Sequence, residues 1–410
     1  MANQAHQVKG KNFFERHPKK TLGVLVVLAV LVAAFIADRL LALKIEPQGP
    51  GHERFVRLRE LSPLTVERFT PKPEVFDAEA GSQPRQVVIR SDEQGFIMPS
   101  RVHDQPDLVL AFLGGSTTEC RAVPEENRFP YLVGRELEKV FQVKVNSYNA
   151  ARSGNNSLHS LNILLHKVMP LQPDIVVMMH NLNDLITLLY EKTYWNQNPS
   201  RRVMVEVRPT LVGEVRGFFQ VLREYTIPNL YRALKELSQR ARGPDQDVDE
   251  FRHVRGQKVE INRLHLLQEF TNNLQMFVDM CWAREITPVL MTQANRMVAH
   301  LDSETWKEVQ VLEAQGISYA AFRELYGQFN QAIRDVGVAN QVLVVDLARE
   351  ILPEQRFIHD PVHLTERGSK LAAQIISREL EPVVRERLQD KARDLSKTQD
   401  PMALASSGDK

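Results

Sequence analysis

Five short apolar runs set the pattern of the chain. They cover residues 108–113, 143–148, 175–179, 288–292 and 342–346, and most end in Gly or in small polar residues. Continuous apolar runs of this length are typical of strands buried on both faces of a parallel sheet. Between them, apolar residues at three- and four-residue spacing predict helices at 131–141, 157–168, 261–283, a stretch ending near 336, and 369–390. This alternation predicts a three-layer α/β/α domain with a five-stranded parallel sheet.

A longer apolar stretch lies near the N-terminus. Residues 21–37 carry no charge, and residues 40–43 extend the stretch. A helix of this length nearly spans a bilayer core. The same stretch also fits the apolar core of a signal peptide. The three residues before a possible cleavage site, 35–37, lack the small side chain that signal peptides have at the first of these positions. We therefore expect a single uncleaved transmembrane anchor at 21–43.

The charges around the anchor predict its orientation. Basic residues dominate the segment before it (Lys9, Lys11, Arg16, Lys19 and Lys20, against Glu15). The positive-inside rule then places residues 1–20 in the cytoplasm and the rest of the chain outside it. We expect a single-pass protein of the inner membrane whose main domain is periplasmic.

The remaining organisation follows from shifts in composition. Residues 44–107, rich in Pro, Gly and charge, predict a linker and a small β-rich lead-in. The main domain is expected at 108–390, with an insertion at about 190–259 that breaks the strand–helix rhythm. Residues 391–410 predict a disordered tail.

Composition excludes several classes of protein. The chain has 410 residues, with 52 Lys and Arg against 51 Asp and Glu, and a net charge of +1. Such a balance gives no reason to expect a nucleic-acid partner. The two cysteines, Cys120 and Cys281, form neither a disulfide framework nor a zinc motif. Spacing alone leaves open whether they form one bridge or stay unpaired.

The first apolar run ends in a candidate nucleophile. Gly114, Gly115 and Ser116 follow it directly, and this position corresponds to the crevice where open α/β sheets hold ligands. Before the last predicted helix stand Asp360 and His363. An Asp three residues before a His can reach Nδ1–H and leave Nε2 free to serve as a base. The three residues predict a catalytic Ser116–His363–Asp360 triad.

Two further loops offer hydrogen-bond donors for an oxyanion. Gly154 follows the second predicted strand, and Asn183 follows the third. With the backbone N–H of Ser116, they form a candidate oxyanion site. Each motif alone also fits an ordinary turn, a helix cap or a buried histidine. Their combined position, each after an expected strand, favours the catalytic interpretation.

Other chemistries fit these residues less well. An α/β-hydrolase elbow needs Gly where Thr118 stands, and no phosphate-binding or dinucleotide-binding glycine motif is present. A metal at His359, Asp360 and His363 lacks further ligands nearby, so we expect neither a metal nor a cofactor. Glu119, Arg152 and His180 are expected to support the loops.

At this point the chain resembles the SGNH (GDSL-type) esterase and lipase superfamily. The matching blocks are Gly114-Gly115-Ser116, Gly154, residues 181–184, and Asp360 with His363. Gly115 stands where that family has Asp, and Asn181 where it has Gly. The resemblance implies a flavodoxin-like fold and the triad and oxyanion donors named above.

The function expected from this resemblance is hydrolysis of an acyl ester. We expect a substrate such as an O-acylated cell-surface glycan or lipid, and membrane association through the N-terminal helix. Two alternatives stay open. One is an O-acyltransferase that uses the same site, and the other is a non-catalytic subunit of an envelope complex.

Overall fold

The computed structural model describes residues 17–42, 53–71, 86–207, 256–298 and 312–398. The chain divides into two compact units, residues 1–54 with 206–228, and residues 55–205 with 229–410. In the first unit, helix α2 (Pro18–Ala42) contains the predicted apolar stretch. Among the described helices, it alone is long and apolar enough to cross a membrane, over Pro18–Ala37. Its composition and place near the N-terminus fit both an anchor and a signal sequence.

The second unit is built on the predicted five-stranded sheet. Its strands are β4 (Leu108–Gly114), β5 (Val145–Asn149), β6 (Ile175–Met179), β8 (Thr287–Met291) and β9 (Val344–Val345). All neighbouring pairs are parallel, in the order β5-β4-β6-β8-β9. The expected five-stranded parallel sheet and its flavodoxin-like strand order are thereby confirmed.

The strand order creates a switch point at the end of β4. From β4 the chain passes to β5 on one side, and then to β6 on the other. The connections on the two sides therefore diverge at the carboxyl end of β4, where α/β sheets hold ligands. Ser116 lies two residues beyond this strand.

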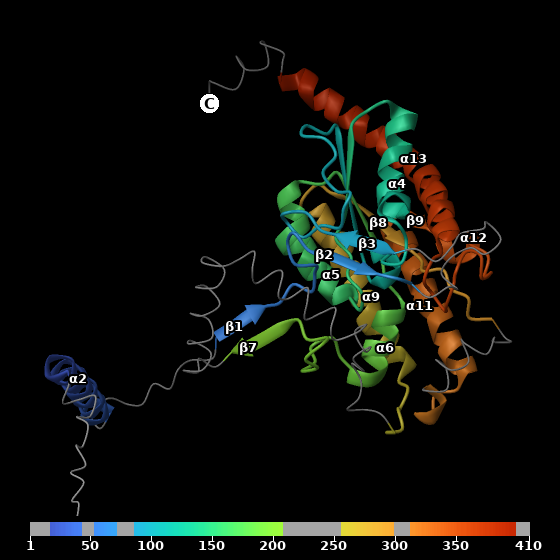
Figure 1. Ribbon diagram of the computed structural model, residues 1–410. Helices are drawn as coiled ribbons and strands as arrows, with labels where there is room; N and C mark the ends of the chain where they lie inside the picture. The colour runs from blue at the N-terminus through green and yellow to red at the C-terminus, as the bar shows by residue number, and fades with distance from the viewer. Residues whose placement is uncertain (1–16, 43–52, 72–85, 208–255, 299–311, 399–410) are drawn as a thin grey trace, which may run out of the picture. The chain divides into compact units, whose positions relative to one another are not determined.

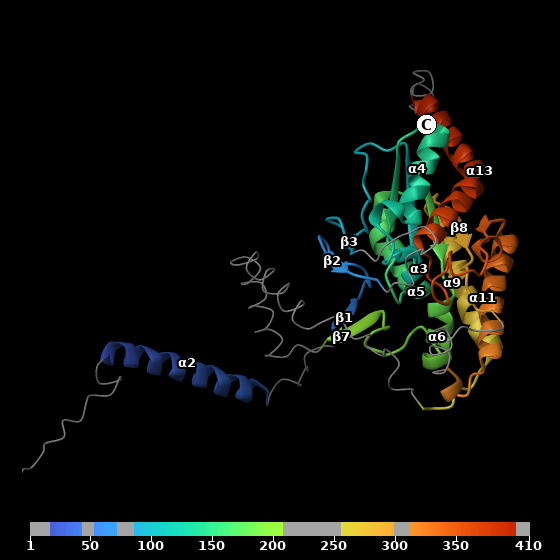
Figure 2. The same cartoon turned by 45° about the vertical axis from the view of Figure 1, so that its right-hand side comes forward.

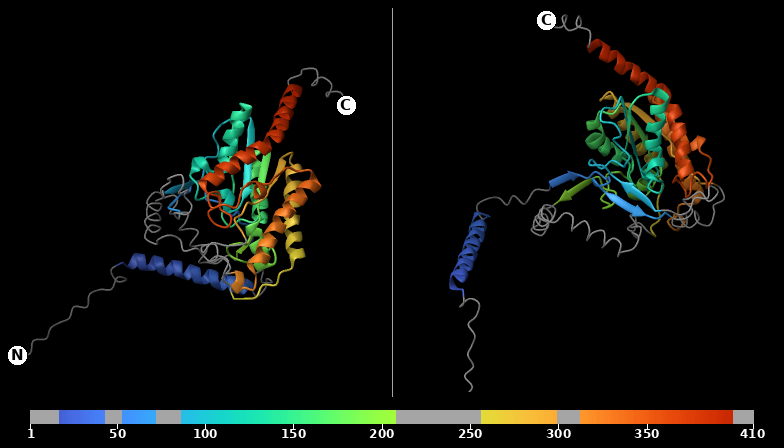
Figure 3. Two further views of the ribbon diagram at one scale, coloured as in Figure 1. Left: turned by 90° about the vertical axis from the view of Figure 1, so that its right-hand side faces the viewer. Right: turned by 45° about the horizontal axis from the view of Figure 1, so that its top comes forward.

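Helices cover both faces of the sheet. On one face lie α4 (Phe129–Phe141), α12 (Leu347–Glu350) and α13 (Glu366–Thr398), with α13 packed along α4 (Figure 2). On the other face lie α5 (Ser157–Ile163), α6 (Leu182–Glu191), α9 (Arg263–Trp282) and α11 (Tyr319–Asn340) (Figure 3). Alternate residues of β4 enter two separate apolar cores, Leu110 and Phe112 on the first face and Ala111 and Leu113 on the second. The three-layer α/β/α architecture is therefore confirmed.

Three elements differ from the expectation. Helix α6 occupies residues that we expected to be a loop followed by the insertion. Strand β9 has only two residues, because Asp346 turns the chain at once into α12. Helix α13 continues through Thr398, so residues 391–398 of the expected disordered tail are helical.

The helix after β5 is also irregular. After α5, the chain continues as a π-helical turn η4 (Leu164–Val168) and a 3-10 turn η5 (Met169–Leu171). Two other short helices, α3 (Ser116–Glu119) and η3 (Glu125–Asn127), follow β4.

The lead-in contributes strands to two small two-stranded sheets. Strands β2 (Val66–Phe69) and β3 (Val87–Arg90) pair antiparallel, and β1 (Glu53–Val56) pairs with β7 (Met204–Val207). The buried guanidinium of Arg128 donates to the carbonyls of Val88 and Met98, at 2.8 and 3.0 Å. These bonds join the lead-in to the start of α4. Residues 208–255, most of the expected insertion, lie outside the described residues.

The two cysteines are buried and free. Burial raises the pKa of the Cys120 thiol to about 12, and it also raises the pKa of Cys281. Both thiols are therefore protonated at neutral pH and weakly reactive.

Candidate active site

Ser116 begins a short helix at the carboxyl end of β4. It is half-buried, whereas the three residues that follow it in α3 are buried. Gly114 permits this tight turn, because a Cβ there would overlap the Thr118 hydroxyl and lie 2.7 Å from Thr118 Cβ and 3.0 Å from the Met179 carbonyl oxygen. The sequence thus places the hydroxyl at the sheet edge and keeps its neighbours in the core.

Ser116, His363 and Asp360 form a continuous hydrogen-bonded row. The Ser116 hydroxyl donates to His363 Nε2 at 2.6 Å, and His363 Nδ1–H donates to Asp360 Oδ2 at 2.5 Å. The second carboxylate oxygen of Asp360 accepts from the backbone N–H of Val362 and His363, at 2.9 and 2.8 Å. The structure therefore brings together the three residues of the expected triad, with the imidazole oriented by the carboxylate.

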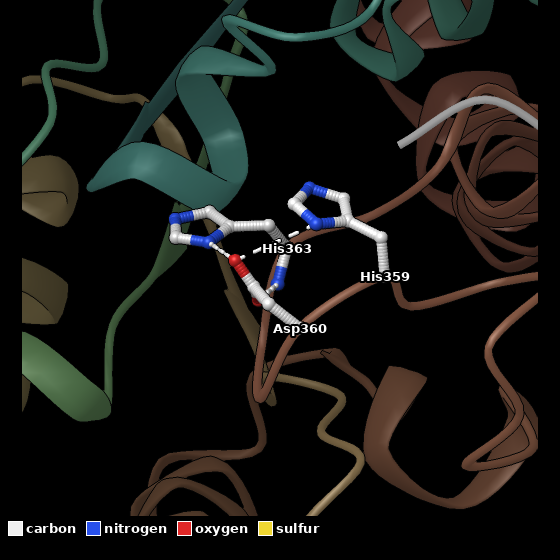
Figure 4. A group of neighbouring side chains, drawn as sticks. All are labelled: His359, Asp360 and His363. Atoms are coloured by element: carbon white, nitrogen blue, oxygen red, sulfur yellow. Dashed lines mark hydrogen bonds and ion pairs between the residues drawn. The ribbon is translucent and has the colours of Figure 1, made fainter. Parts of the chain in front are cut away.

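The charge state of Asp360 fits this arrangement. Burial acts to raise the pKa of Asp360, but the neighbouring His363, through its charge and its hydrogen bonds, and His359 lower it below its usual value. Asp360 is therefore ionised at neutral pH, so a negative charge lies beside the His363 imidazole. Figure 4 shows both histidine rings beside the Asp360 carboxylate.

Thr117 ties the nucleophile turn to the histidine loop. Its hydroxyl donates to the Val362 carbonyl at 3.3 Å and accepts from Gln293 Nε2 at 2.7 Å. The backbone N–H of Arg296 donates to the Pro361 carbonyl at 2.8 Å. These bonds hold together three segments that are far apart in sequence: the nucleophile turn, residues 293–296 after β8, and the histidine loop.

Two of the expected oxyanion donors, Gly154 and Asn183, lie in segments that approach the nucleophile turn. Gly154 has a φ of +80°, a backbone conformation that favours glycine. The Asn183 side-chain amide donates to the Asn155 carbonyl at 2.9 Å. A Cβ on Gly115 would lie 2.5 Å from Asn183 Nδ2 and 3.1 Å from the Asn155 carbonyl oxygen. The loop that carries Gly154 and the first turn of α6, which carries Asn183, therefore both approach the turn that carries Ser116.

The two departures from the family pattern have physical explanations. Gly115 leaves room for Asn183, and a side chain there would displace that amide. The Asn181 side chain points into the core, where its Nδ2 donates to the Tyr326 carbonyl and to Asn330 Oδ1, at 3.0 and 2.9 Å. Asn181 thus braces β6 against α11, while Asn183 remains beside Gly115.

Buried polar groups bind the segments around the nucleophile turn and the Gly154 loop. The Glu119 carboxylate accepts from the Arg152 guanidinium at 2.9 Å and from the Ser153 backbone N–H at 2.7 Å. The buried His180 ring forms a hydrogen bond between its Nε2 atom and Ser160 Oγ at 2.7 Å. Burial lowers the pKa of His180, although the negative charge of Asp184 acts to raise it. Glu119, Arg152 and His180 therefore bind other protein groups, as expected from their positions beside the loops.

An open cavity of about 230 Å³ adjoins Ser116. It is lined by Phe69, Ser116, Thr117, Cys120, Arg121, Ala122, Ser153, His359, His363 and Leu364. Phe69 comes from lead-in strand β2, and its ring lies 4.8 Å from the Arg121 guanidinium carbon. No local sequence pattern predicts that the lead-in lines this cavity, because the contact joins segments that are distant in sequence.

The loop before α13, which carries His363, contains a group of candidate metal ligands. The ligand atoms of His359, Asp360 and His363 lie within 4.8 Å of one another, and no other such group occurs among the described residues. Both ring nitrogens of His363 are already engaged by Ser116 and Asp360. A metal held by this histidine would therefore break the hydrogen-bonded row.

Comparison with known families identifies this arrangement. The model of the GDSL-like Lipase/Acylhydrolase family matches residues 112–371, which run from β4 into α13. The chain belongs to the GDSL-like Lipase/Acylhydrolase family. It is accordingly a serine hydrolase of the SGNH type that acts on ester bonds.

Solved structures similar to this family member come from several bacteria. An acetyl xylan esterase from Geobacillus stearothermophilus is 16% identical, with 67% of this chain and 94% of that chain covered and a TM-score of 0.38. A lipase/acylhydrolase from Enterococcus faecalis is 15% identical, with 67% and 95% covered and a TM-score of 0.38. A GDSL-like lipase from Bacteroides thetaiotaomicron is 13% identical, with 68% and 89% covered and a TM-score of 0.36. A comparison with curated proteins found no match.

Proposed function

We propose that this GDSL-like enzyme is an extracytoplasmic serine esterase whose catalytic residues are Ser116, His363 and Asp360. The observation that carries the proposal is the row of hydrogen bonds from the Ser116 hydroxyl through His363 to Asp360, at 2.6 and 2.5 Å. Such a row supplies a nucleophile, a base and a group that orients the base. A purely binding module has no need of this arrangement.

The proposed cycle has two halves. Ser116 Oγ attacks the acyl carbonyl while His363 Nε2 takes the hydroxyl proton, and His363 then returns that proton to the leaving alcohol oxygen. The acyl group remains as an ester on Ser116. Water next attacks this ester, again with His363 as base, and releases the carboxylic acid and the free serine.

The oxyanion that develops in each half needs hydrogen-bond donors. We assign this role to the backbone N–H groups of Ser116 and Gly154 and to the Asn183 side-chain amide. The approach of Asn183 to Gly115 and the φ of +80° at Gly154 support the assignment. Donors held in place before reaction stabilise the transition state without reorganising.

We propose that α2 anchors the enzyme in the inner membrane with its catalytic domain in the periplasm. The length and apolar composition of α2 and the basic residues before it support this topology. A periplasmic enzyme meets cell-surface material, so we propose an O-acylated glycan or lipid as substrate. Protease treatment of spheroplasts tests the topology: the domain should be degraded in spheroplasts and protected in intact cells.

The catalytic proposal is tested with purified full-length protein and a simple ester. Wild-type protein should hydrolyse p-nitrophenyl acetate, and Ser116→Ala should lose about four orders of magnitude or more in kcat. Equal hydrolysis by the folded Ser116→Ala protein would remove Ser116 from the reaction.

A further inference from the structure

Arg59 contacts the oxyanion loop from outside the family domain. It lies in the lead-in, three residues after β1 and well before the matched residues 112–371. Its guanidinium Nη1 donates to the Gly154 carbonyl at 2.7 Å, and its own carbonyl accepts from Asn155 Nδ2 at 3.0 Å. Arg59 therefore binds two successive residues of this loop through its backbone and its side chain.

The Arg59 guanidinium also packs directly against the Gly154 backbone. A Cβ on Gly154 would lie 2.7 Å from the guanidinium carbon, closer than real contacts allow. The φ of +80° favours glycine at this position, and a side chain there would also push the Arg59 guanidinium away from the loop.

A second arginine reaches the same carbonyl. Arg201, a buried residue, donates through Nη1 to the Gly154 carbonyl and lies 3.5 Å from Asn183 Oδ1. The amide end of Asn183 donates to the Asn155 carbonyl at 2.9 Å. One hydrogen-bonded frame therefore includes both arginines, the Gly154 loop and the first turn of α6, the two segments that we assign to the oxyanion site.

We propose that Arg59 is a positioning residue for the oxyanion site, so that the lead-in is a working part of the enzyme. The inference rests on the proposed function, because it assigns Gly154 and Asn183 to that site. Arg59 holds the Gly154 carbonyl and so fixes the peptide plane between Gly154 and Asn155. The backbone dihedral angles of Gly154 join this plane to the preceding one, which carries the Gly154 N–H, so movement of the first plane also turns the second. Oxyanion donors act only at about 2.7–3.1 Å from the developing charge, so a small rotation weakens them.

This role predicts a specific kinetic signature. An oxyanion forms in the transition state and is absent from the bound ester, so loosening its donors lowers kcat and leaves KM nearly unchanged. A boronic acid, which forms a tetrahedral adduct with the serine, should lose affinity by the same factor as kcat. A purely structural role for Arg59 would lower the amount of folded protein and would not produce this split.

The experiment uses the full chain in detergent, p-nitrophenyl acetate and phenylboronic acid. Arg59→Met keeps the aliphatic stem and removes the N–H donors, and we expect kcat to fall about ten- to a hundredfold with KM within about twofold. Arg59→Lys restores one donor and should recover part of kcat. The matched control is Arg57→Met, because Arg57 is exposed in the same segment and donates to the Pro199 carbonyl at 3.2 Å. This control should behave as wild type.

The outcomes separate the inference from the proposed function. No ester hydrolysis by the wild-type protein overturns the proposed function, and this inference with it. Wild-type hydrolysis with unchanged kcat and boronate affinity in folded Arg59→Met overturns the inference alone. An equal loss in Arg57→Met also overturns it. Should Arg59→Met not fold, Arg59→Lys decides, since wild-type kcat and boronate affinity in that variant contradict the inference.

Discussion

His363 lies 247 residues after Ser116 in the chain, yet its Nε2 atom accepts the Ser116 hydroxyl at 2.6 Å. The sheet accounts for this meeting, because β4 ends where the loop before α13 passes over the sheet edge. Thr117 secures it by donating to the Val362 carbonyl at 3.3 Å. Thr117 follows Ser116 and Val362 precedes His363, so this hydrogen bond keeps the hydroxyl and the imidazole close to each other.

Replacing the orienting acid should leave the fold intact and remove most of the activity. In Asp360→Asn, the amide no longer fixes the His363 tautomer or stabilises its positive charge. We expect kcat for p-nitrophenyl acetate to fall roughly 10⁴-fold. Asp104→Asn, at a side chain that is 95% exposed, is the control and should retain wild-type kcat. A loss of less than about tenfold in folded Asp360→Asn would contradict the assigned role.

A methyl group at Gly115 should disturb Asn183. The added Cβ would lie 2.5 Å from Asn183 Nδ2, so the amide must move away from the nucleophile turn. For Gly115→Ala we expect kcat to fall about ten- to a hundredfold, as for a weakened oxyanion donor. Gly327→Ala is the matched control, because nothing lies within 4 Å of a Cβ there. Wild-type kcat in Gly115→Ala would show that Asn183 does not act in the reaction.

Removing the Phe69 ring should change which acyl groups are accepted. Phe69 lines the cavity beside Ser116, so Phe69→Ala enlarges the apolar space next to the nucleophile. We expect kcat/KM for butyrate or hexanoate esters to rise relative to acetate by about tenfold. Phe55→Ala, at a residue that is 52% exposed, should leave this ratio unchanged. The same ratio in Phe69→Ala and wild type would place the acyl group elsewhere.

Acid should destabilise the fold through His159. Burial, followed by the charges of Arg59 and Arg201, lowers the pKa of His159 from 6.5 to about 3. Between these values the unfolded chain binds the proton and the folded chain does not, so stability falls as the pH drops from 6.5 toward 3. This one group contributes at most about 1.4 kcal/mol per pH unit.

The His159 contribution is measured by urea unfolding between about pH 4 and about pH 7. The slope of unfolding free energy against pH should be smaller in His159→Gln than in wild type. Replacement of the exposed His166 by Gln is the control. Equal slopes in all three proteins would contradict the prediction.

The sequence was sufficient to predict the sheet and the members of the Ser116–His363–Asp360 hydrogen-bonded row, because the strand end and the Asp360–His363 pair each have a local signature. A buried strand is a continuous apolar run, and Gly114 ends it in a way that exposes Ser116. The Asp360–His363 pair spans a single turn, so spacing alone brings its carboxylate to the imidazole. Local sequence patterns therefore sufficed for these features.

Contacts between distant segments had no such signature. Helix α6 was missed because its polar start resembles a loop, although Leu185, Leu188 and Leu189 occur at helical spacing and are buried. Arg59 lies 95 residues before Gly154 in the chain. An arginine in a charged linker is expected to be exposed to solvent, so its sequence context does not predict this contact. Phe69 likewise reaches the cavity only through the folding of the lead-in onto the main domain.

Labelling of the full-length protein with a fluorophosphonate probe tests the central claim most directly. The probe reacts with a serine hydroxyl that a neighbouring base activates. Peptide mass spectrometry should find one adduct, on the peptide that carries Ser116, and Ser116→Ala should carry none. A folded wild-type protein that stays unlabelled, or that carries the adduct on another residue, would contradict the account.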